Sequence, residues 1–500
     1  MSVLYQSTRG GVKGLTFEQV LLSAYAPDGG LYVPQIETMP TLASLGPWDA
    51  NMTVAQVTAR VIAPFTGIPP ADCERFCAAA FRTFNEGKEP SLPLVRVGGR
   101  ILLETGNGPT LAFKDIGQQV VAQLLNHVLG KRGERATILV ETSGDTGPAA
   151  IEGVRQCENV EIFCLYPEGR VSAVQELQMI TVDSPNVHVY RTEGDTDEQA
   201  EALKVVFADA AFMRKHKVTS INSINWARVL VQSAYYVWAC LQVAPPGERV
   251  DFVVPTGAVG NAVGGLIARR LGAPVGRIVC ATNANDIVHR TIATGDMSMR
   301  GNLQTVSPAM DIQFAYNFER VLYFCSEADA ALVGGLMTTL EATRAVSLPP
   351  PLLATIQRVF LSCAVDDAAT LRTMRQVHDE SGGYLLDPHS AIGVHALDAD
   401  PAVRAATAGA RATVVVLTAH PAKFDEAVAQ AGVARQPVAR VEALRALPHK
   451  FRVLRRPADA GVSRAQKLAA WAAELKAAVE AQAELAARRR AETLLVRARL

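Results

Sequence analysis

From residue 136 onward, short apolar runs alternate with longer stretches in which apolar residues recur every three or four positions. The short runs are rich in β-branched residues and almost continuously apolar, which predicts strands buried on both faces of a parallel sheet. They are ATILVE (136–141), VEIFCLYP (160–167), NVHVYR (186–191), VDFVVPTG (250–257), GRIVCATN (276–283) and ATVVVLTA (412–419). The pattern predicts helices over 115–129, 196–216, 226–243 and 261–271. This alternation predicts an α/β fold with right-handed βαβ crossovers.

The two ends of the chain depart from this alternation. The first 90 residues contain a turn cluster, APDGGLYVPQ, and loosely periodic helical sequence, and they lead into a proline-bearing stretch, EPSLPLV. We therefore predict an N-terminal domain over 1–90, a central region over 91–445 and a C-terminal extension over 446–500.

The extension is expected to be helical. Ser463 and Gln466 have the spacing of a capping box at a helix start. Apolar residues then recur on one helical face at Leu468, Trp471, Leu475 and Val479. That face needs a cover, which is either the body of the same subunit or a second copy of the chain, so self-association through this helix is one expectation.

Composition narrows the class of protein. Lys plus Arg and Asp plus Glu both number 49, so the formal net charge is zero, and a nucleic-acid or anionic-membrane partner is not expected. The eight cysteines form no CxxC motif, which favours reduced, buried thiols in a cytoplasmic protein. The opening MSVLYQSTRGG lacks the apolar segment of a secretory signal, and no apolar run is long enough to span a bilayer. Three arginines, Arg488–Arg490, fit the solvated end of an Ala-rich helix.

A glycine-punctuated turn follows the predicted strand at 250–257. Gly257 and Gly260 would let the backbone approach a ligand closely, and the helix beginning near Asn261 offers unpaired N–H groups and a positive dipole end. These features favour an anion site, most plausibly for phosphate. The turn is neither a P-loop nor GxGxxG, so an NAD-binding interpretation has little support. Tight packing of the helix on the strand would explain the two glycines equally well.

A second turn follows the predicted strand at 136–141 and reads Thr142, Ser143, Gly144, Asp145, Thr146, Gly147. Small hydroxyl residues and exposed N–H groups at the carboxyl end of a strand would bind a carboxylate. The competing interpretation is that Ser143 and Thr146 merely cap the next helix.

Lys114 follows an apolar run and precedes a predicted helix whose face is marked by Ile116, Val120, Leu124 and Val128 and which is expected to end at Gly130. A helix start is the unfavourable end for a cation, and apolar neighbours add a desolvation cost, so the pKa of the amine should be lowered. A neutral amine can form a Schiff base with an aldehyde. The alternative is a surface lysine whose stem packs on Phe113. A phosphate cradle, a carboxylate cradle and an imine-forming lysine together suit pyridoxal phosphate acting on an amino acid.

The same segments resemble the threonine synthase family of fold type II pyridoxal-phosphate enzymes. YQSTRGG with APDGGLYVP resembles its N-terminal signature, GPTLAFKD its cofactor-lysine motif and TSGDTG its substrate-carboxylate turn. The later blocks SINSINWAR, SPAMDIQ, NFERVL, DPHSAIG and TAHPAKF also resemble it, so the match runs from residue 5 to about 425. The resemblance implies doubly wound, mostly parallel sheets in two catalytic subdomains, with a smaller mobile subdomain at roughly 125–230.

The resemblance also assigns roles by position. It implies that Lys114 holds pyridoxal 5'-phosphate as a Schiff base and moves protons, and that Thr418 meets the pyridine nitrogen. Residues of the turn at 142–147 would face the bound amino acid: Thr142, Ser143, Gly144, Asp145 and Thr146. The loop around the cofactor phosphate would be Gly257, Ala258, Val259, Gly260 and Asn261. Candidates for the substrate phosphate are Asn222, Asn225, Arg228 and Lys423.

Three departures from the family pattern are evident. The family loop more often reads Gly-Asn-Phe-Gly-Asn/Asp, whereas this one reads GAVGN, which is closer to the threonine synthase-like branch, some of whose members act as phospho-lyases. Gly106-Asn107 replaces Phe-His, and Glu141 replaces a small residue.

The resemblance implies a threonine synthase that converts O-phospho-L-homoserine and water to L-threonine and phosphate by γ-elimination and β-hydration. One alternative is a phospho-lyase releasing 2-oxobutyrate, ammonia and phosphate. Another is a catalytically silent relative that binds a partner through its tail.

Overall fold

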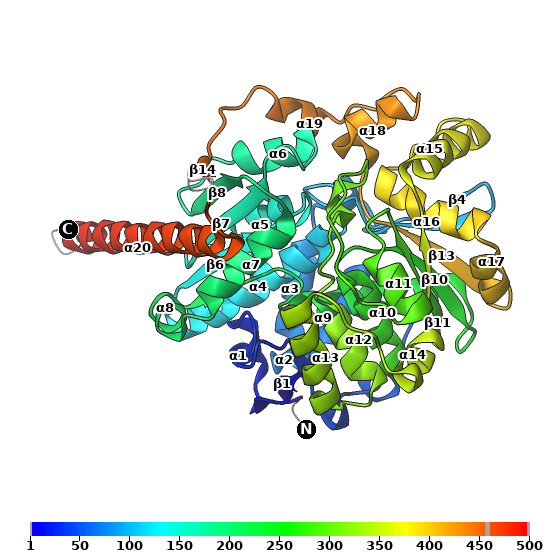
Figure 1. Ribbon diagram of the computed structural model, residues 1–500, viewed down its shortest axis with the longest axis horizontal. Coiled ribbons are helices and arrows are strands. Elements are labelled where there is room, and N and C mark those ends of the chain that lie inside the picture. The colour runs from blue at the N-terminus through cyan, green and yellow to red at the C-terminus, as the bar shows by residue number, and fades with distance from the viewer. Residues whose placement is uncertain (1–2, 456–460, 498–500) are drawn as a thin grey trace.

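The computed structural model describes residues 3–455 and 461–497, and its α/β body contains two mostly parallel sheets (Figure 1). The larger sheet has the strand order β12-β11-β10-β13-β5-β4. Every neighbouring pair in it is parallel except β4 and β5 at one edge. Its strands are β4 (Leu94–Val97), β5 (Arg100–Glu104), β10 (Val250–Pro255), β11 (Val275–Thr282), β12 (Phe360–Ala364) and β13 (Ala412–Leu417).

The smaller sheet is entirely parallel, in the order β14-β8-β7-β6-β9. Its strands are β6 (Ala136–Glu141), β7 (Val160–Pro167), β8 (Val187–Thr192), β9 (Val218–Thr219) and β14 (Arg452–Leu454). Strand β14 comes from the C-terminal extension and pairs with β8, so the extension completes this sheet. The helices of this subdomain are α4 (Lys114–Arg132), α5 (Thr146–Val154), α6 (Ala173–Ile180), α7 (Thr196–Phe207) and α8 (Ala210–His216).

One long helix, α9 (Trp226–Val243), runs through the middle of the molecule and is buried from Trp226 through Cys240. It is buried on all sides because it packs against α2, α4 and α10 at once, and most of its residues are apolar. The remaining helices around the larger sheet are α10 (Gly260–Arg270), α11 (Ile287–Thr294), α12 (Phe318–Cys325), α13 (Ala330–Thr343), α14 (Pro350–Gln357), α15 (Asp367–Ser381), α16 (Pro388–Ala399), α17 (Pro401–Thr407), α18 (Asp425–Gln430) and α19 (Ala439–Leu444).

The N-terminal region forms a small antiparallel sheet with order β2-β1-β3 and a group of helices. Its elements are β1 (Tyr5–Ser7), β2 (Lys13–Leu15), α1 (Phe17–Leu21), β3 (Tyr32–Pro34), α2 (Val54–Thr66) and α3 (Pro70–Phe81). Arg9 joins this region to the rest of the protein through ion pairs with Glu319 (3.0 Å) and Glu341 (2.9 Å).

The predicted α/β class is confirmed, and the six predicted strands are present with ends shifted by at most two residues. The helix predicted over 226–243 is also found. The prediction of one helix over 196–216 was wrong, and the helix predicted over 115–129 is present with different ends. The segment 196–216 forms two helices, because the Asp209 carboxylate accepts a hydrogen bond from the Phe212 N–H (3.0 Å) and starts α8. Helix α4 begins at Lys114 itself and continues past Gly130 to Arg132, where Gly133 ends it with a left-handed φ of 61°.

The C-terminal helix α20 (Arg464–Arg497) packs on the smaller subdomain with its first turns and then projects away from the body (Figure 1). The predicted capping box is present, since Gln466 N–H donates to Ser463 Oγ and Ser463 N–H donates to Gln466 Oε1. The apolar face of α20 is buried against Leu203 and Phe212 of α7 and α8. The subunit itself therefore covers this face.

Within the described ranges 3–455 and 461–497, no helix combines the length and the apolar character that crossing a membrane requires.

We expect the Trp471→Ala substitution to lower the free energy of unfolding by about 3–5 kcal/mol, because Trp471 is 1% exposed and its removal leaves a cavity under α20. Denaturant titration measures this. The matched control is Leu485→Ala on the same helix, which is 40% exposed and should change stability by less than about 0.5 kcal/mol. Equal effects of the two substitutions would show that α20 does not dock as described.

Candidate active site

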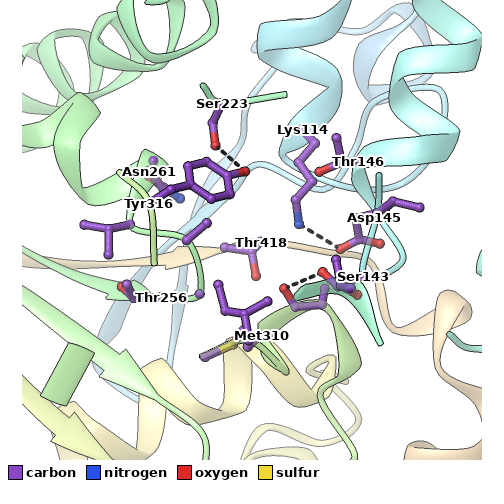
Figure 2. Close-up of a pocket in the computed structure, with 18 of the residues that line it drawn as sticks. Lys114, Ser143, Asp145, Thr146, Ser223, Thr256, Asn261, Met310, Tyr316 and Thr418 are labelled. Carbon is purple, nitrogen blue, oxygen red and sulfur yellow. Dashed lines mark hydrogen bonds and ion pairs between the residues drawn. The ribbon is translucent and has the colours of Figure 1, made fainter. Parts of the chain in front are cut away.

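A pocket lies between the two sheets, at the carboxyl ends of β6, β10 and β13, where ligands bind in open α/β sheets (Figure 2). The turn after β6 contributes Ser143 and Thr146, the loop after β10 contributes residues 257–261, and Thr418 follows β13. Lys114, the first residue of α4, also lines the pocket. The predicted site residues therefore converge on one pocket, apart from Gly144, which lies within the turn but does not line it.

Backbone pairing brings Lys114 next to Thr418. The N–H of Phe113 donates to the carbonyl of Thr418 (2.8 Å), which joins the segment before α4 to the end of β13. The buried Asp115 carboxylate holds this segment in shape by accepting hydrogen bonds from the N–H (2.8 Å) and hydroxyl (2.6 Å) of Thr110. Lys114 is thus the first residue of α4, and these hydrogen bonds hold the loop before it in place.

The Lys114 amine lies 3.6 Å from a carboxylate oxygen of Asp145 and points into the pocket (Figure 2). Burial lowers the pKa of Lys114, and the nearby charges of Arg228 and Lys423 lower it further, against the opposing effect of Asp145. The predicted direction of the shift is therefore confirmed. A larger fraction of the amine is neutral, which makes it a better nucleophile toward an aldehyde.

Asp145 binds a second buried lysine more closely than it binds Lys114. The Lys423 ammonium is fully buried, 2.9 Å from Asp145, and donates to the Thr110 carbonyl (2.8 Å). Although burial alone would raise it, the two lysines hold the pKa of Asp145 well below its usual range. Asp145 also accepts a hydrogen bond from Gln175 (2.9 Å). The Asp145 carboxylate is therefore fully engaged by protein groups, and it compensates the charge of Lys423.

The turn at 142–147 leaves two hydroxyls facing the pocket. The N-cap residue of α5, Asp145, makes no side-chain cap hydrogen bond, and the Thr142 hydroxyl accepts the N–H groups of Gly144 (2.9 Å) and Gly147 (3.0 Å) instead. Ser143 donates to the Ala309 carbonyl (3.2 Å), and the Thr146 hydroxyl has no hydrogen bond to any described residue. The interpretation that Ser143 and Thr146 serve only as caps is therefore wrong. Both line the pocket and suit a carboxylate.

The loop after β10 has the form of an anion cradle. Val259 adopts a left-handed φ of 66°, which is costly for a β-branched residue. The backbone N–H groups that follow it belong to the first turn of α10, where an anion can bind. A Cβ on Gly260 would lie 3.0 Å from Ser223 Cβ, so only glycine fits there without displacement. The Oδ1 atom of Asn261 accepts from Tyr236 (2.6 Å), and its buried Nδ2 has no partner among the described residues. An unsatisfied buried donor beside a helix N-terminus fits a bound phosphate.

Thr418 is 5% exposed and its hydroxyl faces the pocket (Figure 2). Its backbone groups are used by Ser390 and Phe113, but its hydroxyl makes no hydrogen bond within the described part of the chain. A hydroxyl in this position can bond to a ring nitrogen. A nucleophilic amine, a cradle with an unsatisfied donor and a free hydroxyl around one cavity fit pyridoxal phosphate.

The pocket also contains residues to which the sequence assigned no role: Glu141, Asp197, Met310, Tyr316 and His389. His389 Nε2 accepts the Ala309 N–H (3.1 Å), so its Nδ1 carries the proton and donates to Asp387 (2.9 Å). The SPAMDIQ and DPHSAIG blocks pointed to the segments around Ala309 and His389, although not to this contact.

The four candidates for a substrate phosphate separate clearly in the structure. Asn225 caps α9 through the Ala227 N–H (3.1 Å), and Lys423 is neutralised by Asp145. The Asn222 amide donates to the Glu141 carbonyl (3.2 Å). Arg228 lines the pocket.

Comparison with known proteins gives consistent matches along the chain. Residues 84–419 match the pyridoxal-phosphate dependent enzyme family, residues 4–81 the threonine synthase N terminus and residues 390–465 the threonine synthase C-terminal region. A threonine synthase of Pseudomonas aeruginosa is 40% identical over 437 residues, covering 87% of this chain and 91% of that protein. Human threonine synthase-like 2 is 40% identical over 465 residues, covering 90% and 94%. The fold resembles pyridoxal-phosphate-bound threonine synthase from Brucella melitensis, with TM-score 0.84, 39% identity and coverage of 96% and 99%.

We expect borohydride to fix added pyridoxal phosphate covalently to the wild-type protein but not to the Lys114→Ala variant, because the other buried lysine, Lys423, is bound by the Asp145 carboxylate and the Thr110 carbonyl. Mass spectrometry of tryptic peptides measures the adduct. Lys131→Ala, on the exposed end of the same helix, is the matched control and should be labelled like wild type. Undiminished labelling of Lys114→Ala would mean that another lysine forms the link.

Proposed function

The chain belongs to the threonine synthase family of pyridoxal-phosphate-dependent enzymes, and on that basis we propose that it binds pyridoxal 5'-phosphate and converts O-phospho-L-homoserine and water to L-threonine and phosphate. The observation that carries this proposal is the buried Lys114 amine at the centre of a pocket formed by the 257–261 loop, Thr418 and the 142–147 turn.

Each group around the pocket has a role in this proposal. Residues 257–261 would hold the cofactor phosphate, and the Thr418 hydroxyl would bond to the ring nitrogen. When bound, the cofactor supplies a conjugated ring that stores the electrons released as C–H bonds of the amino acid break. A hydroxyl, unlike a carboxylate, does not keep the ring nitrogen protonated, so the ring withdraws electrons moderately. Ser143 and Thr146 hold the substrate carboxylate, with Thr142 shaping their turn.

Lys114 is the group that moves protons. With cofactor and substrate bound, its free amine would remove the proton from Cα and relay a proton from Cβ. The lowered pKa of Lys114 suits it to this work, because a neutral amine accepts a proton near neutral pH. Asp145 keeps the amine directed into the pocket.

Arg228 is the cation best placed for the substrate phosphate. Burial lowers its pKa to about 10, so it stays charged at neutral pH although it is 2% exposed. Its Nε–H is unsatisfied, and across residues 3–455 and 461–497 no carboxylate lies within ion-pair distance of it. A buried, uncompensated guanidinium is costly, and a phosphate dianion would relieve that cost.

A second reaction outcome, release of 2-oxobutyrate in place of threonine, has support from the residues that form one wall of the pocket. Val259 and Ala258 stand where the typical family loop has Phe and Asn, so the wall is smaller and less polar. A synthase must hold one water at Cβ, and a looser wall weakens control of that water. The alternative product is 2-oxobutyrate, released with ammonia and phosphate. Relatives named threonine synthase and threonine synthase-like 2 are equally similar to this chain.

Replacement of Thr418 by Asp should keep the ring nitrogen protonated, strengthen electron withdrawal and change both the absorption spectrum of the bound cofactor and the ratio of products. Thr418→Val, which removes only the hydrogen bond at similar volume, should weaken cofactor binding by about 0.5–1.5 kcal/mol. Titration of the cofactor and product analysis measure the two effects. A Thr418→Asp protein with wild-type spectrum and products would contradict the proposed contact.

Incubation with O-phospho-L-homoserine, with threonine, 2-oxobutyrate and phosphate quantified together, tests the function directly. We expect phosphate and threonine in equal amounts. Phosphate matched by 2-oxobutyrate, with only a trace of threonine, would replace the synthase by the lyase. No phosphate release by the cofactor-loaded protein would overturn both.

A further inference from the structure

Glu141 is a buried carboxyl group that the proposed chemistry has not yet used. It is the last residue of β6, is 8% exposed and lines the same pocket as Lys114. Its backbone is fixed by the Asn222 amide, which donates to its carbonyl (3.2 Å). The Asn222 amide and the backbone N–H of Glu141 also lie close enough to its carboxyl group to favour the ionised form, but in the described part of the chain this group has no ion-pair partner within 4.0 Å. A purely structural buried glutamate would be expected to have such a partner.

Glu141 and Arg228 face the same space without forming an ion pair. Both line the pocket, each influences the protonation of the other, and each lacks a charged partner within 4.0 Å among the residues described. Two opposite charges that share a buried pocket at longer range leave room for a group between or beside them. The substrate phosphate, held by Arg228, would occupy that position and bring an oxygen to the Glu141 carboxyl.

An ionised Glu141 would repel a phosphate dianion, so its protonation state matters. Burial raises the pKa of Glu141 to about 7, and much of it is therefore protonated near neutral pH. The charged and titratable groups around it come from β7, α7, α9 and two loops. They are Cys164, Asp197, Arg228, Tyr25 and Tyr316. Asp197 acts to raise the pKa of Glu141, and Arg228 acts to lower it.

Loss of phosphate from a monoester requires a proton. When the bond between Cγ and the bridging oxygen breaks, the electron pair goes to oxygen, and the dianionic ester would leave as trianionic phosphate, a very poor leaving group. A proton delivered to the bridging oxygen in the same step makes the product hydrogen phosphate instead. The electrons of the new Cβ–Cγ double bond come from the Cβ–H bond whose proton Lys114 removes.

We propose that Glu141 is the acid that protonates the departing phosphate of the substrate. Its carboxyl proton moves to the bridging oxygen as the Cγ–O bond breaks, and Glu141 becomes a carboxylate. The water that later adds as hydroxyl at Cβ releases one proton, which restores the acid before the next turnover. This step rests on the proposed function, because it requires a phosphate ester bound at Arg228.

Other acidic groups in the pocket are less suited to this step. Asp145 is held ionised by two lysines. The pKa of Tyr316 is raised by burial to about 12, and its hydroxyl bonds to Ser223 (3.2 Å). The Asp197 carboxylate accepts the Gln313 N–H (3.0 Å), which anchors it to the loop before α12.

The test compares two substrates in the Glu141→Gln variant, which keeps the size and hydrogen-bonding capacity of the side chain but has no proton to give. We expect phosphate release from O-phosphohomoserine to fall by about 100-fold or more. L-Vinylglycine already has the Cβ–Cγ double bond and no phosphate, so the variant should turn it over within about twofold of wild type. Equal losses on the two substrates, or no loss on either, would overturn the role of Glu141.

The pH dependence provides a second readout. Because the acid must be protonated, the wild-type kcat/KM for O-phosphohomoserine should fall as the pH rises through about 7, and Glu141→Gln should lack this decline. Asp197→Asn is the matched control, since it removes the neighbouring buried carboxylate and should retain the decline. A decline that persists in Glu141→Gln and disappears in Asp197→Asn would assign the acid to Asp197 instead.

Sulfate binding to the cofactor-loaded protein separates this proposal from the proposed function, because it needs no turnover. Sulfate stays dianionic across the range, so its dissociation constant in wild type should rise by about tenfold between about pH 6 and about pH 8.5 as Glu141 ionises. The rise should be largely absent in Glu141→Gln. Equal rises in both proteins would overturn the role of Glu141 even if the enzyme makes threonine, and no phosphate release by wild type would overturn the proposed function together with the acid step.

Discussion

The pairing of Asp145 with two buried lysines is the interaction on which the site depends. Asp145 follows β6 of the smaller sheet, Lys423 follows β13 of the larger sheet, and Lys114 begins α4. Breaking a buried charge pair typically costs about 3–5 kcal/mol, because the remaining charge stays buried without a partner. Here one carboxylate neutralises two cations, so it joins both sheets and keeps one of the amines in the pocket. The Asp145 carboxylate therefore contributes both to the position of the reactive amine and to the contact between the two sheets.

The hydrophobic pattern predicted much of this architecture because strands covered on both faces are continuously apolar. Strands β6 and β10 are buried along their whole length, and β7 is buried except at Glu161. Strands β4 and β14 were not predicted, since they lie at sheet edges, are short and are partly exposed. Pairing partners far apart in the sequence decide whether such segments become strands, and no local period reports that.

The site was predictable to the level of its turns and its lysine, but not to the level of its contacts. The glycine loop, the hydroxyl turn and Lys114 are visible because backbone approach and amine chemistry restrict the residue types. Asp145 lines the pocket as expected, but the sequence did not reveal that its carboxylate is bound by Lys423 and Gln175. Arg228 and Glu141 became informative only through burial and the absence of an ion pair between them within 4.0 Å in the described chain. Burial and the lack of an ion pair depend on residues that are distant in the sequence, so the spacing of residues along the chain does not reveal them.

Strand β14 and helix α20 have a consequence for the order in which the protein can form on the ribosome. The smaller sheet is built from residues 136–219 and from 452–454, and the helices α7 and α8 that belong to it are covered by residues 468–479. During synthesis, β8 is therefore an open edge, and the surface beneath Trp471 is bare, while more than two hundred further residues are added. The larger sheet has all its strands earlier, since β13 ends at Leu417. The nascent chain therefore passes through a stage in which all strands of the larger sheet have been made but the smaller sheet still lacks β14. At that stage the exposed edge of β8 is accessible to chaperones or to another nascent chain.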